Sequence, residues 1–124
     1  MLDVGAGSGI LSLAAMLLGA SRVVACDTDA EAVRAAAERF RQRGLRAGLL
    51  LGSVDAMASG TADVVVANIE WDVLVALKAE LRRVLKPGGR VVLSGIPRER
   101  LEAVRAAYGD GEALEKEGWA ALLW

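Results

Sequence analysis

The stretch Met1-Leu2-Asp3-Val4-Gly5-Ala6-Gly7-Ser8-Gly9-Ile10 (MLDVGAGSGI) decides the fold of this chain. A short apolar run leads into three glycines that alternate with small residues, and an apolar helical segment over about 9–18 follows. Glycine lets the backbone turn sharply and lets a ligand approach it closely. The start of the helix offers free backbone N–H groups and the positive end of a dipole. The pattern predicts a strand, a ligand-binding loop and a helix, and a tight turn without a ligand is the alternative.

Strand and helix signals alternate along the rest of the chain. Apolar and β-branched runs predict strands over 2–4, 22–26, 46–51, 62–67 and 90–94, and helical spacing predicts helices over 9–18, 71–86 and 98–107. A further helix begins at the capping-box sequence Thr28-Asp29-Ala30-Glu31 and ends at Gly44, and residues 111–124 predict a hairpin that turns near Glu117-Gly118. Because strands that alternate with helices form parallel β–α–β units, we expect an open α/β sheet with an antiparallel strand at one edge.

The first helix and the single cysteine carry predictions about burial. Residues 9–18 are apolar on nearly every side, which predicts a helix that is buried on most of its faces. Cys26 lies in the apolar run 23–26 and has no second cysteine to pair with. We expect a small buried hydrophobic residue of a protein in the reducing cytoplasm, and a reactive thiol is the alternative.

Composition excludes several classes of function. The net charge of −1 gives no indication of binding to nucleic acid or to an anionic membrane. The chain shows no secretion signal, and its longest apolar helical segment, 10–18, is too short to span a bilayer. No histidine and only one cysteine are present, which argues against a transition-metal site.

The spacing of the glycines distinguishes between classes of ligand. A dinucleotide-binding loop needs Gly or Ala at the position of Ile10, and here the third glycine comes one residue earlier, as Gly9. A nucleoside triphosphate loop needs Gly-Lys-Ser/Thr, and no lysine precedes Lys78. Neither ligand fits the pattern at 3–9, in which an acid in the strand precedes three alternating glycines.

Polar residues also follow three other predicted strands, at the edge of the sheet where such folds bind ligands. These residues are Asp27, Gly52-Ser53 and Asn68. A carboxylate at the position of Asp27 can accept hydrogen bonds from both hydroxyls of a ribose, and a charge at the start of the next helix is the alternative. The alternatives for Ser53 and Asn68 are a turn-forming hydroxyl and a cap on the strand end.

Four segments, DVGAGSG (3–9), VVACDTD (23–29), ADVVVANIE (62–70) and LKPGGRVVLSGI (85–96), resemble the Rossmann-like S-adenosylmethionine-dependent methyltransferases. Among these, the chain is similar to the ribosomal protein L11 methyltransferase (PrmA) family in GSGILSLAA (7–15), VVANI (65–69), LSGI (93–96) and GWAAL (118–122). The resemblance implies a doubly wound, mostly parallel, seven-stranded sheet with one antiparallel edge strand. It also implies a methyltransferase domain over 1–124 with S-adenosylmethionine as its cofactor.

The resemblance further implies which residues hold the cofactor. Asp3, Gly5, Ala6, Gly7 and Gly9 surround its methionine part, Asp27 with Thr28 beside it holds the ribose, Ser53 and Val54 lie beside the adenine, and Asn68 lies near the transferred methyl group.

Methyl transfer to nitrogen needs a neutral acceptor amine that is aligned with the sulfonium, with water excluded. A lysine amine normally titrates near ~10, so a carboxylate that takes its proton assists the reaction. Asn68 and Glu70 are the predicted catalytic residues, with Asp72 as a second candidate acid. The alternative for both acids is a charge in the first helical turn. Trp71 either shapes the substrate entrance or packs against the sheet edge.

The chain departs from the family pattern in several places. Residues 1–124 contain no match to the family's N-terminal recognition domain or to its Gly-Thr-Gly-x-His-x-Thr-Thr segment, and its Asn-Ile-Leu-Ala is Asn68-Ile69-Glu70-Trp71 here. We therefore expect residues 1–124 to bind the cofactor weakly and not to methylate a protein on their own. The determinants that select the acceptor are expected upstream.

The function that the resemblance implies is N-methylation of a protein of the ribosomal L11 type in the cytoplasm. Three alternatives are a cofactor-binding remnant without activity, a methyltransferase for another protein or small molecule, and a nicotinamide-dependent oxidoreductase. Ile10 argues against the oxidoreductase.

Overall fold

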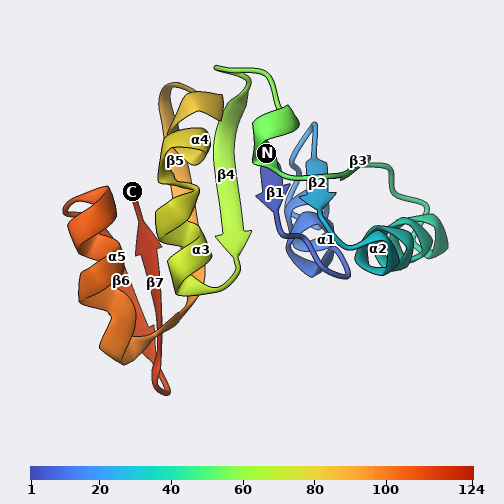
Figure 1. The fold of residues 1–124 in the computed structure, drawn as a ribbon. Coiled ribbons are helices and arrows are strands. Elements are labelled where there is room, and N and C mark those ends of the chain that lie inside the picture. Colours follow the sequence, from blue (N-terminus) through green and yellow to red (C-terminus); the bar gives the residue numbers. More distant parts are fainter.

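Seven strands form one sheet in the order β3-β2-β1-β4-β5-β7-β6 in the computed structural model, which describes all 124 residues (Figure 1). The strands are β1 (Leu2–Val4), β2 (Val24–Asp27), β3 (Gly48–Leu51), β4 (Ala62–Asn68), β5 (Leu85–Pro97), β6 (Glu112–Lys116) and β7 (Trp119–Leu123). The strands β1 to β5 pair in parallel, and β7 is antiparallel to both β5 and β6. The predicted α/β class is confirmed, and the antiparallel strand β7 lies between β5 and the edge strand β6.

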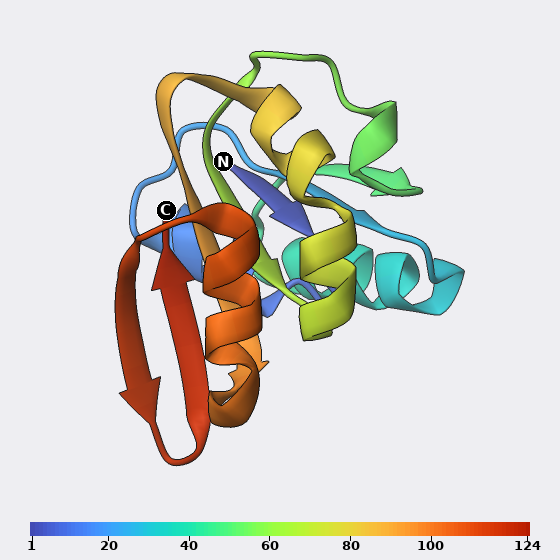
Figure 2. The same cartoon turned by 60° about the vertical axis from the view of Figure 1, so that its left-hand side comes forward.

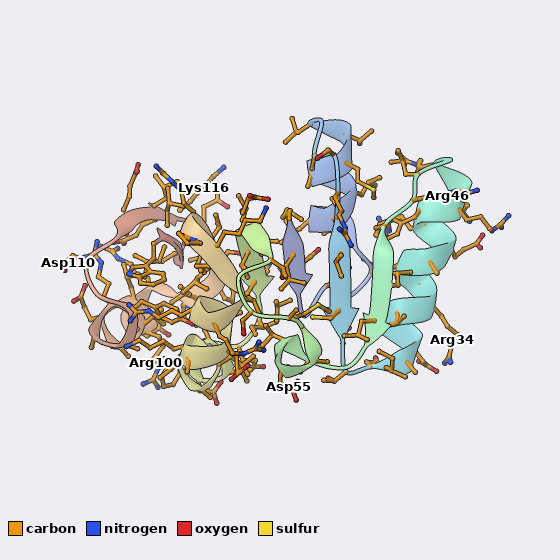
Figure 3. All side chains as sticks on the ribbon, turned by 90° about the horizontal axis from the view of Figure 1, so that it is seen from above. Arg34, Arg46, Asp55, Arg100, Asp110 and Lys116 are labelled. Atoms are coloured by element: carbon orange, nitrogen blue, oxygen red, sulfur yellow. The ribbon has the colours of Figure 1, made fainter.

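Helices cover both faces of the sheet. They are α1 (Ile10–Leu17), α2 (Ala30–Gln42), α3 (Trp71–Ala76), α4 (Lys78–Val84) and α5 (Leu101–Tyr108), with the short 3-10 helices η1 (Val54–Ala56) and η2 (Arg98–Arg100). Viewed from the starts of the parallel strands, α1 lies on one side of the sheet and η1 with α4 on the other (Figure 3). Strand order reverses between β1 and β4, which places the switch point of the fold at the carboxyl ends of these two strands.

The hydrophobic core is divided unequally between the two faces. The main cluster has 18 buried residues from the sheet and from η1, α3, α4 and α5, including Leu74, Leu93 and Val104. The second cluster is small: Leu13 from α1 packs with Ala36 and Phe40 from α2. Most of the apolar burial is thus on the face of the sheet that α3 to α5 cover (Figure 2).

The prediction that the first helix is buried on most sides is wrong. Within α1 only Ser12 and Leu13 are buried, while Leu17 is 66% exposed. The adjoining Leu18 is 89% exposed. One side of α1 packs against the sheet and α2, and the other has nothing packed on it, so apolar composition overstated its burial.

Two predicted boundaries also shift. The single helix expected over 71–86 is two helices, because the helix is interrupted at Leu77, which lies between α3 and α4. The strand expected at 90–94 begins at Leu85, which pairs with Ala62, and resumes at Arg90, which pairs with Val64. The helix therefore ends at Val84, two residues earlier than predicted, and residues 86–89 form an irregularity between these two pairs of the strand.

The second helix begins one residue later than its capping-box spacing predicts. Asp29 is the N-cap, and its Oδ1 accepts a hydrogen bond from the Glu31 N–H at 2.8 Å. The aspartate side chain takes this role instead of Thr28, in keeping with the preference for Asp over Thr at this position.

Three further details concern the cysteine, the hairpin and the membrane. Cys26 is buried as predicted, and burial raises the pKa of its thiol to about 11, so the unreactive interpretation is supported. The hairpin turns at Glu117 (φ 52°) and Gly118 (φ 83°), and two positive φ angles define a type I′ turn. None of the helices has the length and apolarity required to cross a membrane.

We predict that Tyr108→Phe lowers the free energy of unfolding by about 1–2 kcal/mol. The buried Tyr108 hydroxyl donates to the Leu74 carbonyl at 2.6 Å, which joins α5 to α3, and phenylalanine cannot make this bond. Urea unfolding followed by circular dichroism measures the difference.

The difference in stability between the wild type and Tyr108→Phe also depends on pH. Burial raises the pKa of Tyr108 from 10.0 to about 12, so the folded state holds this proton more tightly than the unfolded state. The advantage of the wild type over Tyr108→Phe is therefore full below pH 10 and declines between pH 10 and about 12. Equal stability of the two proteins at pH 7 would show that the hydrogen bond from Tyr108 to the Leu74 carbonyl does not stabilise the fold.

Candidate functional site

The glycine loop after β1 is bonded to the end of β2. The N–H groups of Gly5 and Ala6 both donate to the Cys26 carbonyl, at 2.9 and 3.0 Å. The Gly7 N–H donates to Asp27 Oδ2 at 2.8 Å. Three successive N–H groups thus join the loop to its neighbouring strand, and the loop has a fixed shape before any ligand binds.

Glycine at positions 7 and 9 serves two different needs. A Cβ at Gly9 would lie 2.7 Å from the Phe40 ring and 3.1 Å from the Ala36 methyl group, so the close packing of loop on α2 excludes a side chain there. A Cβ at Gly7, where φ is 54°, would meet nothing within 4 Å. The loop is therefore packed against protein at Gly9 and open at Gly7, which leaves room for a ligand over the backbone.

Asp3 lies beneath the loop, with no exposed surface. Its Oδ2 accepts hydrogen bonds from the Ser12 N–H (3.0 Å) and the Ser12 hydroxyl (2.7 Å), while its Oδ1 has no partner. Burial raises the pKa of the Asp3 carboxyl, and the two bonds from Ser12 oppose this effect. A buried carboxylate oxygen without a donor is costly, and a ligand amine at the loop fits this position chemically.

Asp27 ends β2 and remains half-buried at the loop. Besides the bond from Gly7, its Oδ1 accepts from the Asp29 N–H at 2.9 Å. A carboxylate has about four acceptor sites, so each oxygen keeps a free site for a ribose hydroxyl. Thr28 beside it is exposed.

The end of β3 lies next to this carboxylate. The Gly52 N–H donates to the Asp27 carbonyl at 2.8 Å, which brings the half-buried Ser53 to the same edge. The Val54 side chain is fully buried in the core, so only its backbone is available to a ligand. Leu51, which pairs with Asp27, is 57% exposed and offers an apolar surface that sequence reasoning did not identify.

The residues after β4 line a cavity of about 390 Å³. Its walls are Asn68, Ile69, Glu70, Trp71, Gly95, Pro97 and Trp119. A Cβ at Gly5 would collide with Ile69 Cγ2, so the glycine loop and the cavity meet at this residue. The loop and the cavity are thus adjacent parts of one site at the switch point.

Within the cavity, Asn68 and Glu70 differ from Asp72. The Asn68 amide lies directly over Gly95, where a Cβ would collide with its Oδ1, and the Glu70 carboxylate is exposed and makes no hydrogen bond. Asp72 does not line the cavity, and its Oδ1 accepts from the Val73 N–H at 2.8 Å in the first turn of α3. The structure therefore brings Asn68 and Glu70 together and leaves Asp72 in the helical role that was its alternative.

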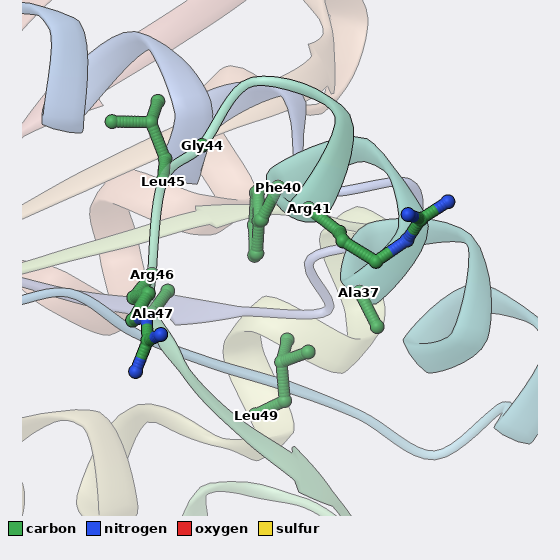
Figure 4. A pocket seen from close by; sticks show the side chains of 8 residues that line it. All are labelled: Ala37, Phe40, Arg41, Gly44, Leu45, Arg46, Ala47 and Leu49. Carbon is green, nitrogen blue, oxygen red and sulfur yellow. The ribbon is translucent and has the colours of Figure 1, made fainter.

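A second cavity, of about 440 Å³, lies between the end of α2 and β3 (Figure 4). Phe40, Leu45 and Leu49 form its apolar walls, and Arg41 and Arg46 lie at its rim. It is next to the start of β3, its Phe40 wall packs on Gly9 of the glycine loop, and none of the predicted cofactor residues lines it.

A family model for ribosomal protein L11 methyltransferase (PrmA) matches residues 1–124. The chain belongs to this family. The ribosomal protein L11 methyltransferase of Symbiobacterium thermophilum is 44% identical to it over 128 residues, a match that covers 99% of the chain and 42% of that relative. The Azotobacter vinelandii protein of the same name is 42% identical and is covered to 44%. The chain thus spans less than half the length of these PrmA relatives.

Solved structures agree with this assignment to the PrmA family. The ribosomal protein L11 methylase of Lactobacillus delbrueckii subsp. bulgaricus superposes with a TM-score of 0.93 at 32% identity, over 98% of this chain and 67% of that one. The Thermus thermophilus 16S rRNA methyltransferase RsmC, solved with AdoMet and guanosine, gives 0.83 at 25% identity, over 98% and 36%. The expected family and fold are confirmed.

Sequence reasoning missed four residues of the site: Ser12, Leu51, Gly95 and Trp119. Gly95 carried a signal, because it lies inside the quoted segment LSGI directly after a strand. Ser12 and Trp119 also lie inside quoted segments, GSGILSLAA and GWAAL, but their roles depend on contacts between distant segments, as does the role of Leu51, which lies in none of them.

We predict that Asp3→Asn raises the free energy of unfolding at pH 7 by about 1–2 kcal/mol, because it removes a buried charge that lacks one hydrogen bond. The raised pKa means that folded Asp3 holds its proton above pH 3.8, where unfolded Asp3 has lost it. The contribution of Asp3 to the free energy of unfolding of the wild type therefore falls as the pH rises above 3.8. The difference in free energy of unfolding between Asp3→Asn and the wild type widens accordingly. Urea unfolding of both proteins from about pH 3.5 to 7 measures this difference. A difference that narrows as the pH rises would contradict the raised pKa of the buried Asp3 carboxyl.

Proposed function

We propose that residues 1–124 are a methyltransferase domain that binds S-adenosylmethionine and transfers its methyl group to nitrogen of a ribosomal protein of the L11 type. The observation that carries the proposal is the bond from the Gly7 N–H to Asp27 Oδ2 at 2.8 Å. It joins an open glycine loop to an acid at the neighbouring strand end, and this pair suits a ligand with both a nucleoside and a charged amino-acid part.

The residues of the loop fit the two ends of S-adenosylmethionine. Asp27 has free acceptor sites for the ribose hydroxyls, and Ser53 lies at the adjoining strand end beside the adenine. The orphaned Asp3 Oδ1 beneath the loop supplies negative charge where the methionine amine would lie. When bound, the cofactor supplies an activated methyl group on a sulfonium.

The acceptor side is the cavity that begins at Ile69. Asn68 holds its side-chain amide over Gly95 at the mouth, in a position to align an amine nitrogen. Glu70 lies on the same wall, exposed and unpaired, and takes the proton that a lysine amine must lose before it can act as a nucleophile. Burial of the amine in the cavity assists this step, because removal from water disfavours the ammonium form.

The acceptor class comes from the names of the relatives, which are ribosomal protein L11 methyltransferases. A protein substrate in the cytoplasm fits an acceptor cavity that opens at the surface of the sheet edge. A dinucleotide-dependent oxidoreductase is not supported, because Ile10 occupies the position where that loop needs Gly or Ala.

We predict that Asp27→Ala weakens S-adenosylmethionine binding by roughly ten- to a hundredfold, since it removes charge-assisted hydrogen bonds to the ribose and releases the Gly7 N–H. Isothermal titration calorimetry of the chain with S-adenosylmethionine measures the change. Asp110→Ala removes an exposed acid in the turn before β6 and is the matched control.

Two results would reject the proposal. If the wild type binds NAD more tightly than S-adenosylmethionine, the loop serves another ligand. If Asp27→Ala and Asp110→Ala bind S-adenosylmethionine equally well, Asp27 does not hold the ribose.

A further inference from the structure

The strand β6 forms one edge of the sheet and is open on its outer side. It pairs with β7 alone, and no helix lies beyond it (Figure 2). An edge of this kind presents backbone N–H and C=O groups without partners, which can pair with a strand from another molecule. The question is which strand the residues of β6 would accept.

The hydrogen bonds of the terminal hairpin determine which backbone groups of β6 point outward. Val91 and Trp124 exchange both of their backbone hydrogen bonds, at 2.7 and 2.9 Å, so the backbone groups of Trp124 face β5. Because these groups alternate in direction along a strand, those of Leu123 face β6, where its partner is Glu112.

Alternate residues of β6 therefore use their backbone groups in different ways. Those of Glu112, Leu114 and Lys116 are directed toward β7. Those of Ala113 and Glu115 are directed away from the sheet. The outer edge of β6 thus has the free N–H and C=O groups of two residues that flank Leu114.

The side chains of β6 also alternate, between the two faces of the sheet. Ala113 packs against the main hydrophobic cluster, on the face that α3 to α5 cover. Glu112, Leu114 and Lys116 lie on the other face, where Leu114 is 70% exposed. The strand presents an uncovered leucine with an acid two residues before it and a base two residues after it.

The charges on either side of Leu114 are not neutralised within the chain. Neither Glu112 nor Lys116 forms an ion pair, whereas Glu115 on the opposite face is paired with Arg98 at 2.8 Å. Four positions of an extended strand span about 13 Å, so Glu112 and Lys116 of one copy cannot reach each other.

These features make the strand complementary to a second copy of itself. With a twofold axis at Leu114, an antiparallel pair places Glu112 opposite Lys116 of the second copy. Ala113 and Glu115 then exchange their free backbone groups across the axis. Leu114 meets Leu114 in a non-hydrogen-bonded pair, the type in which facing side chains lie closest. Backbone bonds, an apolar contact and an ion pair on each side of the axis occur in the same register.

We propose that β6 is the interface of a homodimer, in which two copies pair antiparallel along this strand and join their sheets into one. The twofold arrangement uses the same edge of both copies, so assembly stops at the dimer. The glycine loop and Asp27 follow β1 and β2, which are separated from β6 by three other strands. The inference is therefore independent of the proposed function and leaves the loop open in both copies.

Sedimentation velocity of the chain over a series of concentrations tests the proposal. We expect a monomer–dimer equilibrium that Glu112→Lys and Lys116→Glu each weaken by roughly ten- to a hundredfold, because like charges then face each other at both ends of the interface. Leu114→Lys also weakens the dimer. Leu18→Lys is the matched control, since Leu18 on the far side of α1 is 89% exposed, and it leaves the dimer unchanged.

Combining the two charge reversals separates pairing from a structural effect. The double variant Glu112→Lys/Lys116→Glu restores opposite charges across the axis and dimerises like the wild type. A mixture of the two single variants forms a heterodimer in preference to either homodimer, because each supplies the charge that the other lacks. Circular dichroism verifies that every variant is folded.

Several results would overturn the proposal. One is a wild type that stays monomeric up to about 1 mM. Another is a dimer that Leu114→Lys and the single charge reversals leave intact, or a loss of association that neither the double variant nor the mixture restores. Species that grow beyond the dimer, or a dimer that Leu18→Lys removes, would assign the association to a different surface.

Discussion

The hydrogen bond between the Gly7 N–H and the Asp27 carboxylate is the interaction on which the rest of the site depends. The same carboxylate accepts from the Asp29 N–H, and Asp29 in turn caps α2. One side chain therefore fixes the loop after β1, the end of β2 and the start of the next helix. Because these bonds are made within the protein, the loop is organised in advance of its ligand and little conformational entropy is lost on binding.

The acid beneath the loop, Asp3, lowers the stability of the folded chain at a position where its charge would favour ligand binding. Asp3 is fully buried, and Ser12 satisfies only one of its two oxygens. Asp27 adds to the rise in the pKa of Asp3, so two carboxylates near one loop disfavour the charged state of the inner one. A cationic ligand group nearby would balance the charge of this carboxylate, and the folded chain bears the cost of burying it in the absence of that group.

Local pattern was sufficient to predict the strands around the glycine loop, the buried Cys26 and the hairpin turn. Each depends on apolar periodicity or on turn residues within a few positions. The burial of α1 and the break at Leu77 could not be predicted in this way, because they depend on what packs against each helix. The site shows the same division: Asp27 and Asn68 followed from strand ends, whereas Trp119 lines the cavity only through the pairing of β7 with β5.

The order of the sheet also has a consequence for synthesis of the chain. The glycine loop, Asp27 and Ser53 belong to β1, β2 and β3 and the segments that follow them, which are adjacent in sequence as well as in space. Trp119 lies five residues before the last residue of the chain, Trp124, and inserts beside β5 only when β7 has paired. As domains begin to fold from the N-terminal side during translation, the part that contains the glycine loop can form before the rest of the sheet is made. The cavity that Trp119 lines is complete only when β7, which follows the other six strands in sequence, has paired with β5.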